Sequence, residues 1–222
     1  MKKIVAISAC FFVVGIAHAQ THEIDSLKHL LASTIHDTTR VLALKSLAFY
    51  SPNVEGLKLD SRALSLARKI KYKNGEAASL NQFGNDFYGI ANLPKALDYY
   101  LQSMKINEKI GNLDGLAANY GNIALIYSAQ EDYDAALANT YKSIKLRLQT
   151  GNDKIRTGYM AMGNVYEKMN QLDSAMLYYQ KSNEIFNRIS DKYQLSQVLY
   201  GLGKVNAKLG HITSPDLIVA SL

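Results

Sequence analysis

The forty residues from Gly111 to Thr150 read GNLDGLAANYGNIALIYSAQEDYDAALANTYKSIKLRLQT, and their pattern returns in the forty residues that follow. The opening Gly-Asn pair recurs as Gly151-Asn152, and Asp191 begins a further segment at the same interval. Self-similarity with a fixed period of about 20–50 residues is the signature of a repeat architecture. The chain is therefore predicted to be a series of equivalent units.

Each unit carries the spacings of two amphipathic helices. The recurring residues are, unit by unit, Gly84, Ala96, Tyr100 and Ser103; Ala124, Ala136, Thr140 and Ser143; Gly163, Ala175, Tyr179 and Ser182; and, in the last unit, Gly203. Spacings of three, four and seven residues fall on one face of a helix. Each unit is therefore predicted to be two helices joined by a short turn.

A single helical hairpin cannot bury its own apolar face, so successive hairpins are expected to stack and share a continuous core. We expect the small residues Gly84, Ala124, Gly163 and Gly203 to let the helices of a pair approach closely. The stack should curve, with the first helix of each pair on its concave side. Most of the tyrosines lie at core spacing and are expected to pack rather than to bind a ligand.

The small residue on the first helix, the aromatic residue three positions later (Phe87, Tyr127 and Tyr166) and the alanine of the second helix resemble the tetratricopeptide repeat family. The resemblance implies an all-α fold, a right-handed superhelical α-solenoid of antiparallel helix pairs. The period of 39 to 40 residues exceeds the usual 34, which implies longer second helices. Gly-Asn breaks replace the usual closing proline.

The resemblance covers residues 37–222 and divides them into units. The expected segments are a signal peptide at 1–19, an amphipathic helix at 20–36, and repeats at 37–70, 71–110, 111–150, 151–190 and, incomplete, 191–222. The openings of the first two segments after the signal peptide, at 24–27 and 37–41, look similar to repeat regions that precede sensor histidine kinases and helix-turn-helix regulators.

The N-terminus has the features of an export signal. Two lysines precede an apolar run from Ile4 to Ala17, which is too short to span a membrane comfortably. The run ends in a small-x-small pattern, and cleavage after Ala19 is predicted. Lipidation at Cys10 is the less favoured alternative, because the apolar run continues beyond it. We expect a periplasmic or secreted protein, and no cysteine would remain after cleavage.

The composition argues against several kinds of chemistry. One cysteine excludes a disulfide framework. Cleavage of the signal peptide removes two lysines and lowers the net charge from +6 to +4, which is too mild to indicate nucleic-acid binding. His22, His29 and His36 are spaced by seven residues, too far apart along a helix to share a metal, and are expected to be exposed. The acidic residues are expected to be scattered over helix surfaces, which gives no support for a paired-carboxylate site. We expect no metal, no cofactor and no catalytic residue.

The concave face is the predicted place for binding. Aligning the units places nine residues there: Lys45, Asn81, Asn85, Tyr88, Asn122, Thr157, Asn164, Tyr200 and Lys204. Asparagine side chains can pair with an extended peptide backbone or a terminal carboxylate. The family resemblance implies a carboxylate clamp of asparagine and lysine, for which Asn85 and Asn122 match but the lysines are missing. The alternative is ordinary solvated side chains, so Asn85 is expected to touch little.

These features predict an exported scaffold that binds a protein or peptide, as the sensing or scaffolding part of a signalling system, and not an enzyme. The alternative is the N-terminal piece of a sensor kinase or transcription regulator, whose output domain, and any membrane contact, would lie beyond Leu222. An apolar stub at 217–220 favours a longer natural chain, with self-association through the C-terminal repeat as the other possibility.

Overall fold

The computed structural model describes residues 21–33, 35–51, 53–186 and 192–210, and within these ranges the regular elements are helices. A helix at 21–32 is followed by α2 (Asp37–Tyr50), α3 (Asn53–Lys69), α4 (Lys73–Gly89), α5 (Leu93–Ile110), α6 (Leu113–Ala129), α7 (Tyr133–Thr150), α8 (Ile155–Lys168), α9 (Leu172–Phe186) and α10 (Lys192–Lys208). The predicted signal peptide and the apolar stub at 217–220 lie outside the described residues.

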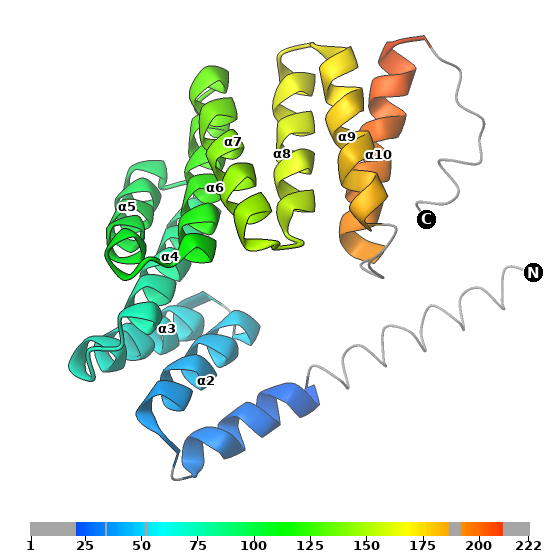
Figure 1. Cartoon of the computed structure of the whole chain (residues 1–222). Helices are drawn as coiled ribbons and strands as arrows, with labels where there is room; N and C mark the ends of the chain where they lie inside the picture. The colour runs from blue at the N-terminus through cyan, green and yellow to red at the C-terminus, as the bar shows by residue number, and fades with distance from the viewer. Residues whose placement is uncertain (1–20, 34, 52, 187–191, 211–222) are drawn as a thin grey trace, which may run out of the picture.

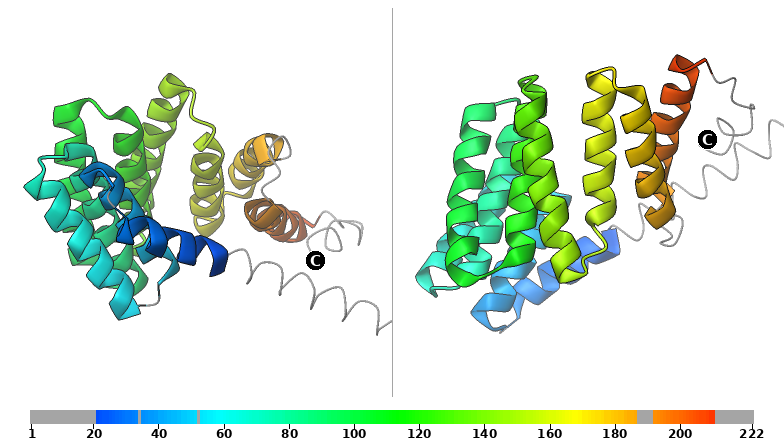
Figure 2. Two further views of the ribbon diagram at one scale, coloured as in Figure 1. Left: turned by 90° about the horizontal axis from the view of Figure 1, so that it is seen from below. Right: turned by 45° about the horizontal axis from the view of Figure 1, so that its top comes forward.

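The helices form antiparallel pairs, α2 with α3, α4 with α5, α6 with α7, and α8 with α9, and α10 packs on α9. Successive pairs follow an arc that begins at the helix 21–32 and ends at α10 (Figure 1). In the central and C-terminal parts the helices stand side by side (Figure 2, right). The predicted all-helical solenoid is confirmed. We call α2, α4, α6, α8 and α10 the first helices and α3, α5, α7 and α9 the second helices.

The Gly-Asn breaks end the second helices as the sequence indicated. Gly111 and Gly151 follow α5 and α7 in the left-handed conformation, with φ of 66° and 67°. A residue without a Cβ adopts this conformation with little strain, and it closes the last helical turn. The side chain of Asn112 then accepts a hydrogen bond from the Gly115 amide at 3.0 Å and caps α6.

Small and large residues alternate where the two helices of a pair meet. Ala96, Ala136 and Ala175 are fully buried. Close approach is real at Gly163, where an added Cβ would lie 2.6 Å from the ring of Tyr179. Gly203 was also expected to allow a close approach of helices, but this expectation is wrong, because nothing lies within 4 Å of a Cβ built there. The Tyr179 ring meets α10 half a turn earlier, 2.7 Å from a Cβ at Gly201.

The recurring serines connect the two helices of each pair. Each serine hydroxyl donates to a backbone carbonyl near the start of the first helix, 26 positions earlier in the sequence. The bonds are Ser103 to Ala77 at 2.8 Å, Ser143 to Ala117 at 2.6 Å and Ser182 to Arg156 at 2.9 Å. The three serines are buried, so these bonds satisfy hydroxyls that water cannot reach.

The helix at 21–32 covers the open end of the first pair. Ile24, Leu27 and Leu31 pack against the buried cluster of α2 and α3. The three histidines are exposed, as expected, and the His36 ring accepts a hydrogen bond from the Thr38 amide at the start of α2. Among the described helices, none has the length and apolar character needed to cross a membrane.

Replacement of Ala136 by Leu is expected to lower the free energy of unfolding by about 1–3 kcal/mol, because the fully buried site has no room for a larger side chain. The same replacement at Ala138, exposed on the same helix, should change it by less than about 0.5 kcal/mol. Urea denaturation of both variants checks this. Equal losses would show that the register of the repeat is misassigned.

Candidate binding groove

A cavity of about 350 Å³, which we call the groove cavity, lies among the first helices α4, α6, α8 and α10. It is lined by Tyr88, Ala124, Leu125, Ser128, Ala129, Thr140, Ala161, Asn164, Val165, Glu167, Lys168, Tyr179, Gln197, Tyr200, Gly201 and Lys204. Neighbouring first helices touch at α2–α4, α4–α6 and α8–α10, whereas α6 and α8 make at most a marginal contact. The groove cavity opens at this separation.

One position of the repeat explains why there is space here. In the pairs before and after, a buried tyrosine ring fills the equivalent place, with Tyr100 against Gly84 and Tyr179 against Gly163. In the α6–α7 pair the same position holds the smaller Thr140, whose hydroxyl bonds back to the Ala136 carbonyl at 2.9 Å. The volume that a tyrosine ring would fill at this position is therefore left open, and Thr140 forms part of the cavity wall.

Four of the nine predicted residues line the groove cavity, namely Tyr88, Asn164, Tyr200 and Lys204. Lys45 and Asn81 line a second cavity of about 210 Å³ between α2, α4, α5 and α6, which we call the amide cavity. Asn85 and Asn122 lie between the two cavities, and Thr157 lines neither. The structure thus divides the predicted set between two hollows rather than joining it in one.

Glu167 is the centre of the polar side of the groove cavity. Its Oε1 accepts from Lys204 Nζ at 2.7 Å and from Lys208 Nζ at 3.2 Å, and its Oε2 accepts from the Tyr179 hydroxyl at 3.1 Å. Burial by itself would raise the pKa of Glu167, but these hydrogen bonds outweigh it and lower that pKa below its usual value. Glu167 is therefore ionised at neutral pH and holds α8 against α10.

Two further contacts fix the walls. The Tyr179 hydroxyl lies 2.6 Å from Asn164 Oδ1, which orients that amide. Lys168 Nζ donates to the carbonyl and hydroxyl oxygens of Ser128 at 3.3 and 3.2 Å. This second contact joins α8 to α6 across the separation between them.

Asn85 does not behave as predicted. Its side chain is exposed, but its Oδ1 accepts from the Tyr100 hydroxyl at 2.9 Å and from Asn122 Nδ2 at 3.2 Å. Asn122 Nδ2 also donates to Asn81 Oδ1 at 3.2 Å. The expectation that Asn85 touches little is wrong, because the buried tyrosine reaches up to the groove surface. Asn85 and Asn122, the two residues that match the asparagines of a carboxylate clamp, are thus hydrogen-bonded to each other. Asn81 Nδ2 is buried and has no hydrogen-bond partner.

The sequence suggested that the acidic residues all lie on helix surfaces, but at least one of them is buried. Asp60 on α3 is 2% exposed and its Oδ1 has no hydrogen-bond partner. Burial, reinforced by the charge of Asp86 and opposed by that of Lys45, raises the pKa of Asp60 to about 7. Burial also lowers the pKa of Lys45, against the influence of Asp60. Asp60, Asp86 and Lys45 thus form a group of charged side chains beside the amide cavity, in which Lys45 partly offsets the two acids.

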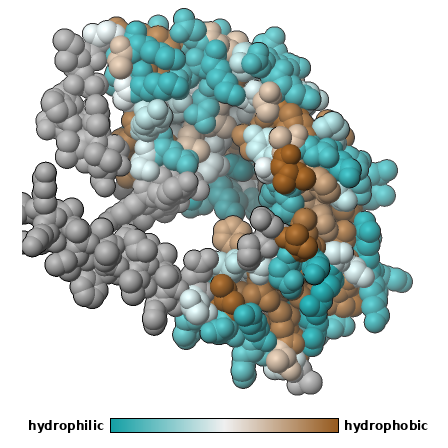
Figure 3. All heavy atoms as spheres, turned by 180° about the vertical axis from the view of Figure 1, so that it is seen from behind, coloured by the Kyte–Doolittle hydropathy of each residue, from teal (hydrophilic) through white to brown (hydrophobic). Residues whose placement is uncertain are grey.

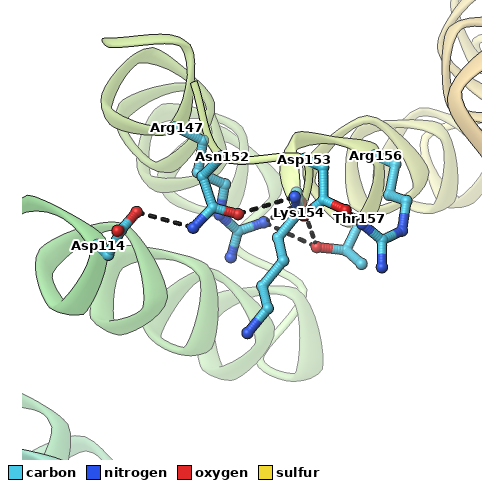
Figure 4. A network of polar contacts seen from close by, with 7 residues as sticks. All are labelled: Asp114, Arg147, Asn152, Asp153, Lys154, Arg156 and Thr157. Atoms are coloured by element: carbon cyan, nitrogen blue, oxygen red, sulfur yellow. Dashed lines mark hydrogen bonds and ion pairs between the residues drawn. The ribbon is translucent and has the colours of Figure 1, made fainter. Parts of the chain in front are cut away.

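Thr157 belongs to a structural network at the start of α8. Its Oγ1 accepts from Arg147 Nη1 at 2.7 Å and donates to the Lys154 carbonyl, also at 2.7 Å (Figure 4). In the same view Asn152 donates to Asp114 at 2.8 Å. These bonds connect α6, α7 and the turn before α8. The side chain of Thr157 is therefore occupied in holding α8 in place.

Apolar side chains elsewhere on the surface are dispersed. One face of the molecule is mainly hydrophilic with separate hydrophobic patches (Figure 3). Exposed examples such as Phe49, Leu148 and Leu177 lie on different helices. Single exposed apolar residues are common on soluble proteins. The groove cavity is distinguished because it combines depth with converging polar groups.

The sequence did not single out Glu167, Lys168 or Gln197 as groove residues. Each occupies an ordinary polar position on a helix, and their convergence depends on how α6, α8 and α10 are placed. The signal that could have located the cavity was the change from tyrosine to threonine at position 140.

Residues 115–188 match the model of the tetratricopeptide repeat family, over the two pairs that meet at the groove cavity. This part of the chain consists of tetratricopeptide repeats. No curated protein sequence matches it.

Solved structures resemble this repeat protein over most of its length. The Rap conjugation gene regulator of plasmid pLS20, in complex with the Phr* peptide, has a TM-score of 0.79 at 14% identity, with 95% of this chain and 58% of that chain covered. BtubC (BKLC) from P. vanneervenii has a TM-score of 0.70 at 16% identity, with 92% and 86% covered. A set of TPR-like repeats from a putative kinesin light chain of Podosopora anserina has a TM-score of 0.62 at 13% identity, with 85% and 95% covered. At these identities the likeness shows the fold alone.

Proposed function

We propose that this tetratricopeptide repeat protein is a scaffold that binds a peptide segment of a partner protein along its first helices. The observation that carries the proposal is the groove cavity, a preformed hollow with walls from four first helices. Concave, largely preformed sites with a few converging polar groups are typical binding sites.

An extended peptide suits this surface better than a compact ligand does. The groove cavity and the amide cavity both lie along the row of first helices, with Asn85 and Asn122 between them. Amide groups offer both donors and acceptors to a peptide backbone. The structural likeness to a regulator solved in complex with a peptide supports the same reading.

Site-specific photo-crosslinking tests the proposal in cells of the source organism. A photoreactive phenylalanine derivative replaces Tyr200, which is 70% exposed in the groove, or Tyr141, which is 62% exposed on the second helix α7. The proposal expects a specific partner crosslinked from position 200 and not from position 141. Crosslinks from position 141 alone, or from neither position, would contradict it.

We further propose that the scaffold acts by binding rather than by catalysis, as the sensing or scaffolding part of a signalling system. A signal transduction ATPase with a tetratricopeptide repeat sensor, from Pyrococcus horikoshii, is among the similar structures, and this chain covers 27% of it. Co-purification of the crosslinked partner with a kinase, regulator or receptor is the expected result. A purely metabolic partner would contradict it.

Export of the protein is also proposed, supported by the lysines, the apolar run and the small-x-small pattern before Gln20. Mass spectrometry of the protein from the envelope or the medium is expected to find Gln20 at the N-terminus. An intact Met1 on protein in that fraction would contradict the proposed cleavage.

A further inference from the structure

The charges of the groove cavity are mostly engaged within the protein. Glu167 accepts hydrogen bonds from Lys204 and Lys208, and Lys168 donates to Ser128. Two lysines on one carboxylate leave a surplus of positive charge at the rim. This surplus attracts an acidic ligand group and repels a basic one, and its exposure to solvent decides how strongly it does so.

The surplus positive charge is solvated. The side chains of Lys204 and Lys208 are 47% and 41% exposed. An ion pair at such an exposed place contributes little to binding, because water competes for both charges and salt screens them. An acidic group on a ligand would therefore add only a modest gain.

The apolar side of the cavity offers more. Leu125 is 42% exposed on α6, and Ala129 and Ala161 stand beside it on α6 and α8. Tyr88 and Tyr200 reach the cavity from α4 and α10. Covering such surface with an apolar group removes it from water, which is the larger source of affinity.

We propose that the groove cavity receives a large apolar side chain, aromatic in preference, from a peptide segment. The proposal rests on the proposed peptide-binding function and names the anchor residue of its ligand. The anchor occupies the volume that Tyr100 and Tyr179 fill in the flanking pairs and that Thr140 leaves open. A peptide ring thus completes the stack of rings along the solenoid.

The cavity exists before the ligand arrives. The Tyr179 hydroxyl fixes Asn164 at 2.6 Å, and Lys168 joins α8 to α6 through Ser128. Asn164 and Gln197 then place amide groups on the wall beside the anchor, where they can pair with the peptide backbone. Preorganised walls lower the ordering cost of binding.

Selection from a random peptide library displayed on phage, against the purified protein, tests the anchor. Enriched peptides are expected to share one aromatic or large aliphatic position, with little selection for charge at the neighbouring positions. Replacing that residue by alanine in a fluorescent synthetic peptide should weaken binding about 10- to 100-fold, as expected for losing one buried apolar side chain. Raising the salt concentration should change the affinity by less than about threefold.

Two protein variants locate the anchor. The double variant Ala124→Gly/Thr140→Tyr rebuilds the glycine–tyrosine pair of the neighbouring repeats and fills the cavity, so it should abolish binding of the selected peptide. If that variant does not fold, Leu125→Ala removes one wall and should weaken binding about fivefold. Leu177→Ala, with 48% exposure on the second helix α9, is the matched control and should bind as wild type does.

The outcomes separate the two proposals. Failure to enrich any peptide would overturn the peptide-binding function and this inference with it. Enrichment of charged peptides without an apolar anchor would overturn the inference alone. Equal binding by Leu125→Ala, Leu177→Ala and the folded double variant would do the same, because binding would then occur elsewhere.

Discussion

Between pH 5 and pH 8, the free energy of unfolding of the wild-type protein is expected to fall by about 2–3 kcal/mol more than that of an Asp60→Asn variant. The cause is the buried, unpartnered carboxyl group of Asp60, whose pKa is raised to about 7 by burial and by Asp86. Each unit of pKa difference between folded and unfolded states is worth about 1.4 kcal/mol.

The sign follows from proton binding. An unfolded aspartate titrates near pH 4, so between about pH 4 and pH 7 the folded state holds a proton that the unfolded state has lost. Stability due to this site is present at low pH and is lost as the pH rises through about 7. The asparagine variant carries no charge at this position and should lack this part of the pH dependence.

Urea denaturation at pH 5 and pH 8 measures the difference. The control is Asp98→Asn, which changes an exposed carboxylate on α5 and should keep the wild-type pH dependence. Equal pH dependence in the wild type and in Asp60→Asn would mean that Asp60 is solvated in the folded state.

Replacement of Tyr179 by alanine should lower the free energy of unfolding by about 3–5 kcal/mol. The ring is 1% exposed and lies between Gly163 of α8 and Gly201 of α10, so its removal leaves a cavity. The variant also loses the hydroxyl that contacts Asn164 and Glu167. Loss of the ring and of its hydroxyl contacts should weaken the packing of α9 against α10.

Tyr141→Ala is the matched control, because this tyrosine is 62% exposed on α7. Its effect should stay within about 0.5 kcal/mol. A loss at Tyr179 no larger than that at Tyr141 would contradict the packing described for the last repeats.

The architecture could be predicted because it depends on local patterns that recur. Gly111 and Gly151 end helices through their own backbone conformation, and the buried alanines lie at helical spacing from the small residues. Neither feature requires knowledge of distant contacts. Gly203 was misjudged because the Tyr179 ring extends beyond its own pair and meets α10 two residues earlier.

The groove could be predicted only in part. Alignment of the repeats identified the first-helix positions, including Asn164 and Lys204, because equivalent positions share a face. It could not show that α6 and α8 separate, nor that Glu167 joins lysines about forty residues away in sequence. Asp60 looked like any surface acid, since its burial results from the packing of α3 against neighbouring helices.

Amide hydrogen exchange, followed with and without a selected peptide, tests most directly whether the first helices bind peptide. We expect slower exchange in α6, α8 and α10 on peptide binding, centred on Leu125, Asn164 and Tyr200, with α5, α7 and α9 little changed. Protection confined to the second helices, with the groove unchanged, would contradict it.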